Sequence, residues 1–232
     1  MTTKKETFES LMLEFSTNRN VHEVFRDYLI VTLSAFTHNQ SIPLVMETYS
    51  RYSDSEIKKV FPELLHRLMT EITERRGSEN GNDVLGEFYE AHIPSNDDQK
   101  ILSWKASRMA LCLPELEVKI ISKHWPIAVL DVGCRSGRIM LASGIKNSSK
   151  YEFLGVEYEF DFIMIATLNL FFNFHHKSEV LWIDQQNGNS FRESYHISIL
   201  PMGIVRNLDP KKSVAWEHYQ LYLQAKKVVT AS

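Results

Sequence analysis

Three acidic residues and two glycines fall where strands of a parallel sheet are expected to end. Asp131, Gly133 and Gly137 lie in the run Val129-Leu130-Asp131-Val132-Gly133-Cys134-Arg135-Ser136-Gly137-Arg138, which reads as a buried strand, a glycine turn and a helix start. Glu157, twenty residues after Gly137, ends a second apolar strand, and Asp184 ends a third. The carboxyl ends of parallel strands meet at one edge of a sheet, where α/β proteins bind ligands. The pattern predicts a nucleotide-type cofactor at that edge.

Each of these residues has a chemical role in that prediction. Gly133 and Gly137 permit a tight turn and the close approach of a ligand. Asp131 would anchor the polar end of the cofactor, Glu157 would bind two ribose hydroxyls, and Asp184 would bind the adenine amino group. The alternative is structural: a strand–turn–helix joint that needs glycine for packing, with solvated acids at the strand ends.

Arg135 stands between the two glycines and places a side chain where the cofactor would pass close to the loop. That side chain either points outward or fills the ligand pocket, and both readings stay open. Elsewhere the nine histidines show no metal-ligand spacing, so no metal site is predicted. No Ser/His/Asp or Cys/His set stands out, and the catalytic residues stay unassigned.

The elements that must position these residues alternate between strand and helix after Pro126. We predict strands at 127–132, 152–157, 179–184 and 196–200, and helices at 136–143 and 159–174. Such alternation predicts a parallel sheet with helices on both faces, with the third, second, first and fourth strands side by side. The last segment, 212–229, is predicted to be helical. It or a partner chain would have to cover the open edge of a four-stranded sheet.

Residues 1–77 are predicted to form a helical N-terminal domain, and residues 83–232 the α/β domain. Ser53-Asp54-Ser55-Glu56 is a capping-box signature that opens a long apolar stripe. Pro62 should kink or split that helix, and Gly77 can end it. The segment 78–82 is the predicted linker, and Asp83 is predicted to cap a short helix over 84–91.

Composition narrows the function classes. The net charge is −3 and the pI about 6.3, so the strongly basic footprint of many nucleic-acid-binding proteins is absent. Two cysteines in dissimilar contexts argue against a disulfide framework and suit the reducing cytoplasm. The N-terminus has no apolar run typical of a signal peptide. The most apolar segment, 160–174, is interrupted by Asp161, Asn169 and Asn173. It is predicted to be a buried helix rather than a membrane span.

Several segments, in order, resemble N6-adenine DNA methyltransferases of the type I modification-subunit kind, including their short phage- and plasmid-borne relatives. Asp83 to Glu90 is similar to the helix that precedes their Phe-Thr-Pro motif, and Val129 to Leu141 to their S-adenosylmethionine loop, Asp-x-Gly-x-Gly-x-Gly. Gly155-Val156-Glu157 with Ala166 to Leu170 resembles their second strand and following helix. Trp182-Ile183-Asp184 resembles their third strand and its adenine-ring aspartate.

The sequence departs from that family at functional positions. Arg135 replaces the central glycine, and 98–105 contains no Phe-Thr-Pro. The catalytic Asn-Pro-Pro-aromatic motif should follow the fourth strand, where the chain reads Leu200-Pro201-Met202-Gly203-Ile204. In the family the asparagine holds the adenine amino group and the aromatic ring stacks on the flipped base. Met202 and Gly203 supply neither group.

The resemblance implies a helical N-terminal part followed by a truncated Rossmann-like S-adenosylmethionine-dependent methyltransferase core. Asp131, Gly133, Gly137, Glu157 and Asp184 would bind S-adenosylmethionine. The implied function is adenine-N6 methylation of DNA with a degenerate catalytic motif, in the cytoplasm, with DNA and a second subunit or second copy as partners. The alternative is a catalytically inactive module that binds or assembles within a restriction–modification or other DNA-processing complex.

Overall fold

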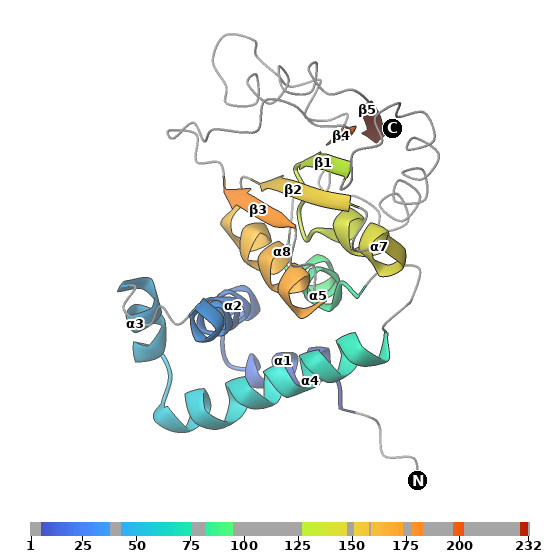
Figure 1. The fold of residues 1–232 in the computed structure, drawn as a ribbon. Coiled ribbons are helices and arrows are strands. Elements are labelled where there is room, and N and C mark those ends of the chain that lie inside the picture. The colour runs from blue at the N-terminus through green and yellow to red at the C-terminus, as the bar shows by residue number, and fades with distance from the viewer. Residues whose placement is uncertain are drawn as a thin grey trace. The chain divides into compact units, whose positions relative to one another are not determined.

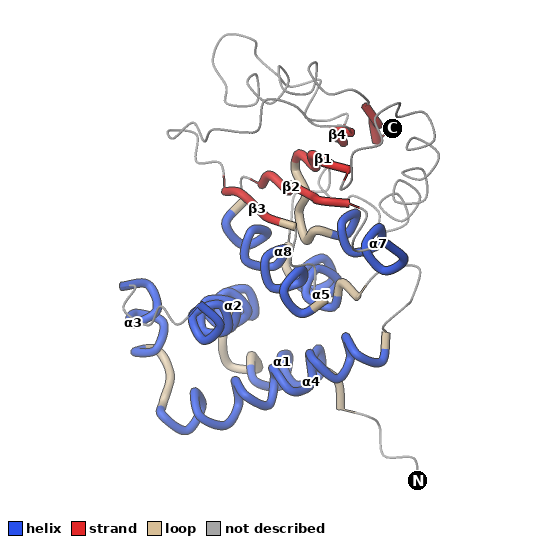
Figure 2. Tube along the Cα trace, in the orientation of Figure 1, coloured by secondary structure: helices blue, strands red, loops and turns tan. Residues whose placement is uncertain are grey.

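The computed structural model describes residues 6–37, 43–75, 82–94, 127–147, 151–157, 159–173, 178–182, 197–201 and 228–231. The chain forms two compact units (Figures 1 and 2). The first contains Met1–Arg76 and Val84–Lys100, and the second contains Gly77–Asp83 and Ile101–Ser232. The chain therefore crosses from one unit to the other three times, twice within a few residues of Asp83.

The first unit is helical in its described part, as predicted for residues 1–77; it also includes Val84–Lys100, which we assigned to the α/β domain. Its elements are α1 (Phe8–Phe15), α2 (Val21–Thr37), α3 (Pro43–Ser50), a π-helical turn η1 (Glu56–Val60), α4 (Phe61–Glu74) and α5 (Val84–His92). An aromatic cluster joins three of the helices: the Phe88 ring lies 5.7 Å from the Phe8 ring and 4.9 Å from the Phe25 ring. Offset and edge-to-face contacts of this kind add to the stabilisation from burial alone.

The predicted capping box and the predicted effect of Pro62 are both present in the long helix. The Ser53 N–H donates to Glu56 Oε2 at 2.8 Å, and the Glu56 N–H donates to Ser53 Oγ at 3.3 Å. Pro62 lies in the first turn of α4, directly after the π turn. A proline ring clashes with the carbonyl four residues earlier. That carbonyl belongs to Lys58, inside the wider π turn, so the helix accommodates Pro62 by a local change of pitch.

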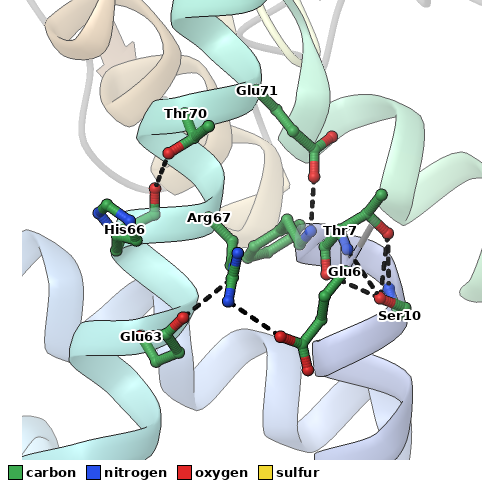
Figure 3. A network of polar contacts seen from close by, with 9 residues as sticks. Glu6, Thr7, Ser10, Glu63, His66, Arg67, Thr70 and Glu71 are labelled. Atoms are coloured by element: carbon green, nitrogen blue, oxygen red, sulfur yellow. Dashed lines mark hydrogen bonds and ion pairs between the residues drawn. The ribbon is translucent and has the colours of Figure 1, made fainter. Parts of the chain in front are cut away.

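Polar contacts anchor α1 to α4 (Figure 3). Arg67 of α4 pairs with Glu63 on its own helix and with Glu6 just before α1, each at 2.9 Å. The Phe8 N–H donates to Glu71 Oε1 at 2.5 Å. A carboxylate at a helix N-terminus satisfies an amide that lacks an intrahelical acceptor and interacts favourably with the helix dipole. Glu71 therefore fixes the start of α1 in place.

The second unit contains a parallel sheet of five strands. They are β1 (Ile127–Val132), β2 (Tyr151–Glu157), β3 (Glu179–Trp182), β4 (Ile197–Pro201) and β5 (Val228–Ala231), and their order is β3-β2-β1-β4-β5. Every pair is parallel. This order confirms the predicted side-by-side arrangement of the first four strands. The predicted limits of β1, β2 and β4 are correct to within one residue at each end.

Two helices cover one face of this sheet (Figure 1). The first, α7 (Arg138–Asn147), follows β1, and α8 (Phe160–Phe172) follows β2. Their side chains join those of β1, β2 and the β1–α7 turn in one buried cluster: Ile127, Val129, Cys134, Met140, Leu141, Tyr151, Phe153, Ala166 and Leu170. The cluster places the β1–α7 turn directly against β2. Among the described residues no helix is long and apolar enough to cross a membrane.

The end of the chain departs from the prediction. Val228 and Val229 belong to strand β5, so the helix predicted over 212–229 is wrong at its last two residues, and its remainder lies outside the described residues. Val, Val and Thr in succession favour a pleated strand over a helix because their β-branched side chains restrict χ1 in a helix. Since β5 pairs with β4, a strand of the same chain covers the edge for which we expected a helix or a partner.

Candidate functional site

The turn between β1 and α7 has the backbone conformation that the glycine motif predicts. Gly133 has φ 69° and Gly137 has φ 78°, both in the left-handed region that glycine enters without steric penalty. Arg135, between them, also has a positive φ of 50°. The arginine therefore adopts the left-handed backbone that the central glycine of such a loop would adopt, and the shape of the loop survives the substitution.

Strand β2 holds the first half of this loop. The Gly133 and Cys134 N–H groups both donate to the Val156 carbonyl, at 2.8 and 3.1 Å. The Arg135 N–H donates to Glu157 Oε2 at 2.7 Å. The Gly137 N–H turns back to the Cys134 carbonyl at 2.9 Å. These amides have internal acceptors, so they do not form the open row of N–H donors with which a phosphate-binding loop cradles its ligand.

Asp131 and Glu157 end neighbouring strands and are both buried. Asp131 is 2% exposed and Glu157 is 5% exposed. Burial and, to a smaller extent, the negative charge of Glu157 together raise the pKa of Asp131 from 3.8 to about 7. Asp131 Oδ2 has no hydrogen-bond partner among the described residues. Buried polar atoms normally have a partner, and a water, an ion and a ligand group are among the partners that this oxygen would accept.

Glu157 is more fully satisfied than Asp131. Its Oε2 accepts from the Arg135 N–H, and its Oε1 accepts from the Glu159 N–H at 3.2 Å. Both carboxylate oxygens thus accept backbone amides, one from the loop and one from the start of α8. Glu157 therefore holds the loop at the end of β2.

The side chains of Arg135 and Cys134 both pack against other parts of the protein. The Arg135 guanidinium lies 4.4 Å from the centre of the Phe162 ring on α8, a cation–π contact. The head group of Arg135 therefore packs against α8. Cys134 is buried, and burial together with the charges of Asp131 and Glu157 raises the pKa of its thiol. A thiol held neutral in this way is a packing group and a poor nucleophile.

A second buried network, which the sequence analysis missed, holds the other half of the loop. Asp83 Oδ2 accepts from Ser136 Oγ at 2.5 Å and from Arg138 Nε at 2.7 Å. Asn169 Nδ2 donates to Asp83 Oδ1 at 2.7 Å and to the Ser136 carbonyl at 2.9 Å. We had predicted Asp83 only as a helix cap. The usable signal was Asn169 in a largely apolar helix, since a buried amide needs polar partners.

The structure brings together four of the five residues predicted to bind a cofactor: Asp131, Gly133, Gly137 and Glu157 surround one turn at the carboxyl ends of β1 and β2. The fifth, Asp184, lies outside the described residues, as do 98–105 and Met202-Gly203. Within the described ranges, no three His, Cys, Asp or Glu side chains gather as metal ligands.

Comparison with known proteins identifies similar folds among solved structures. No family model and no curated protein matches the chain. Among solved structures, one assigned to the class I S-adenosylmethionine-dependent methyltransferases of Listeria monocytogenes aligns over 83% of this chain and 56% of its own, with 12% identity and a TM-score of 0.50.

Two other similar structures align less well. The methyltransferase subunit of a type I restriction–modification system from Streptococcus thermophilus matches 96% of this chain and 55% of its own, with 12% identity and a TM-score of 0.45. A methyltransferase from Aquifex aeolicus matches 52% and 62%, with 18% identity and a TM-score of 0.38. The chain thus spans between about half and two thirds of the length of these structures. Together with the strand order, the Listeria structure shows that the second unit has the Rossmann-like fold of S-adenosylmethionine-dependent methyltransferases.

Proposed function

We propose that the loop between β1 and α7 binds S-adenosylmethionine or its demethylated product. Asp131, Gly133, Gly137, Glu157 and Asp184 would form the site. The observation that carries the proposal is the pairing of two buried acids with a left-handed glycine turn at the ends of adjacent parallel strands. Fold alone does not specify a ligand, so the chemistry of these groups must support the choice.

That chemistry favours a ligand with hydroxyl and ammonium groups over one with phosphates. Asp131 and Glu157 bring two carboxylates to one place, which repels an anion and attracts a cation. The loop amides at Gly133, Cys134, Arg135 and Gly137 already donate within the protein. S-adenosylmethionine carries positive charge and two ribose hydroxyls and has no phosphate, so these residues fit it. When bound, it would supply an electrophilic methyl group.

In this proposal the carboxylate of Glu157, at the end of β2, accepts hydrogen bonds from the ribose hydroxyls. Asp131 Oδ2 would pair with a donor on the polar end of the ligand, directly or through water. The Gly133–Gly137 turn lets the ligand lie against the backbone. Asp184 would bind the adenine amino group.

For the substrate, we propose adenine in DNA, methylated at N6, with a second subunit or a second copy of the chain as partner in the cytoplasm. Support comes from the ordered resemblance of Asp83–Glu90, Val129–Leu141 and Gly155–Glu157 to type I modification subunits. The alternative is an inactive module of a DNA-processing complex. It is favoured by Pro201-Met202-Gly203, which supplies neither an amide nor a ring where the family has its catalytic motif.

Calorimetric titration tests the cofactor site. The protein should bind S-adenosylmethionine and its demethylated product, and ADP should bind far more weakly. Glu157→Ala should weaken binding by about 1.5–3 kcal/mol, the loss of hydrogen bonds to a charged acceptor. Glu159→Ala, which removes the exposed acid two residues later, is the matched control and should bind like the parent. Absence of binding by the parent protein would remove the proposed site.

A further inference from the structure

The loop is held by two sets of contacts that come from different parts of the chain. Residues 133–135 are bonded to Val156 and Glu157 of β2. Ser136 and Arg138 are bonded to Asp83, and the Ser136 carbonyl also accepts from Asn169. Only the first set contains residues proposed to touch the cofactor. The second set needs its own explanation, because Asp83 is 53 residues away from Ser136 in the sequence.

The second set is buried and is centred on the carboxylate of Asp83. Asp83 is 0% exposed, as is Asn169, and Ser136 and Arg138 are 3% and 6% exposed. Removing a carboxylate from water is unfavourable unless it is paired and hydrogen-bonded. Asp83 meets that condition with three donors, from Ser136, Arg138 and Asn169. Ser136 lies at the end of the glycine loop, Arg138 is the first residue of α7, and Asn169 lies in α8.

Asn169 closes the network by bridging two of its members. Its amide donates to the Asp83 carboxylate and to the Ser136 backbone carbonyl. Asn169 therefore contacts both the loop and the carboxylate that accepts hydrogen bonds from the loop. One turn further along, Asn173 Oδ1 accepts from Asn82 Nδ2 at 3.0 Å. The segment 82–83 is thereby fixed along α8 at two points, which gives Asp83 a rigid base.

We propose that Asp83 is a positioning residue for the cofactor loop. It fixes Ser136 and Arg138, so that the left-handed turn from Gly133 to Gly137 and the first turn of α7 keep one geometry before a ligand arrives. The part of this proposal that concerns ligand affinity rests on the proposed function. The part that concerns the loop does not, since the contacts exist in the protein itself. Preorganisation of this kind lowers the entropy lost on binding.

Amide hydrogen exchange in the ligand-free protein tests the loop directly. Asp83→Asn should speed exchange of the Gly137 amide, which donates to the Cys134 carbonyl, by about tenfold or more, with strand amides of β1 and β2 unchanged. Ser136→Ala removes only one hydroxyl and should produce a smaller change of the same kind. Asp27→Asn is the matched control: Asp27 is 2% exposed and bonds Arg51 and Tyr52 at 2.9 Å in the first unit.

Affinity for S-adenosylhomocysteine, measured well below the unfolding midpoint, supplies the second readout. Asp83→Asn should reduce affinity about tenfold or more, as expected for loss of a hydrogen bond to a charged group, and Asp27→Asn should leave it unchanged even if both lower the midpoint equally. Unchanged loop exchange in both Asp83→Asn and Ser136→Ala would overturn the proposal. So would faster exchange spread evenly over the unit, which would show a general role in stability. A parent protein that does not bind the ligand would instead defeat the proposed function and leave the exchange result to decide the role of Asp83.

Discussion

Arg135 keeps a backbone conformation that a non-glycine residue enters at a penalty of about 1–2 kcal/mol. Two contacts offset that penalty: its N–H bonds the buried Glu157 carboxylate, and its guanidinium stacks on Phe162. The first contact needs only a backbone amide, which glycine also has. The second is available only to a long cationic side chain. A substitution that looks disruptive in the sequence is therefore accommodated locally, and the sequence alone could not reveal the ring that receives it.

Gly155 of β2 has no room for a larger side chain. A Cβ at this position would lie 2.8 Å from Cys134 Sγ and 2.8 Å from the Met140 terminal methyl, closer than real contacts allow. Overpacking of a buried site typically costs about 1–3 kcal/mol. We expect Gly155→Ala to lower the free energy of unfolding by about that amount, as measured by urea denaturation.

The double variant Gly155→Ala/Cys134→Ala is the control for this prediction, because it removes the sulfur that the new methyl would meet. It should recover part of the lost stability, with the coupling expected of residues in contact. If Gly155→Ala unfolds at the same urea concentration as the parent, the close packing of the loop against β2 is wrong.

Asp131 should make stability depend on pH. Its folded-state pKa of about 7 lies above the ordinary value of 3.8. Between these values the folded protein holds a proton that the unfolded chain releases, so this residue's contribution to stability is complete below about pH 4 and is lost as the pH rises to about 7. Asp131→Asn keeps the shape without the charge. Relative to the parent, it should become more stable as the pH rises, by up to about 4 kcal/mol.

Urea denaturation of both proteins at several values between about pH 5 and pH 8.5 measures this difference. Taking the difference cancels the titration of groups that the two proteins share. We expect it to grow up to about pH 7 and then level off. A difference that is constant across the range would show that Asp131 is ionised throughout and has a partner that the described residues do not include.

Among the elements, the limits of α5 and α8 follow from local chemistry and were predicted to within two residues. Helix α7 begins two residues after its predicted start and ends four residues after its predicted end. The irregularity of the long helix depends on one proline. The capping box at Ser53 and the stripe behind it indicate where the long helix begins. Pro62 predicts a break, yet only the structure shows that the break takes the form of a π turn over Glu56–Val60. The choice between a kink and a change of pitch depends on how the two halves pack, which local sequence does not encode.

Ser53→Ala should destabilise the first unit by about 1 kcal/mol, the usual effect of losing an N-cap side chain. It removes the hydroxyl that receives the Glu56 N–H and donates to Glu56 Oε2. Ser55→Ala is the matched control, because Ser55 makes no side-chain cap hydrogen bond. Thermal unfolding followed by circular dichroism should separate the two variants. Equal midpoints for both would contradict the capping role of Ser53.

At the scale of the whole molecule, the parallel order of the first four strands could be predicted, because alternation of strand and helix with right-handed crossovers leaves few topologies. Strand β5 could not, since four residues of β propensity are too short a signal beside a long apolar and basic segment. The hydrogen-bond network around Asp83 could not be predicted from the sequence either. Contacts across 53 to 86 residues depend on the finished fold rather than on local pattern.

The chain alone should not methylate adenine in DNA at a measurable rate. The adenine amino nitrogen is a poor nucleophile until it is held and hydrogen-bonded, and positioning supplies much of the rate. In the family that the sequence resembles, an asparagine motif after the fourth strand does this. Here β4 ends at Pro201, and Met202-Gly203 follow. In addition, the net charge of −3 does not favour electrostatic binding to the phosphate backbone of DNA.

The assay is transfer of labelled methyl from S-adenosylmethionine to plasmid DNA, with a known adenine methyltransferase as the positive control. We expect cofactor binding without incorporation of label, the combination that distinguishes an inactive binding module from a protein that has lost the site altogether. Asn189 and Asn207 are the nearest asparagines that could replace the missing amide, although an ordinary loop position is the favoured interpretation of each. Incorporation by the parent protein that disappears in Asn189→Ala or Asn207→Ala would establish an active enzyme and identify the residue that holds the base.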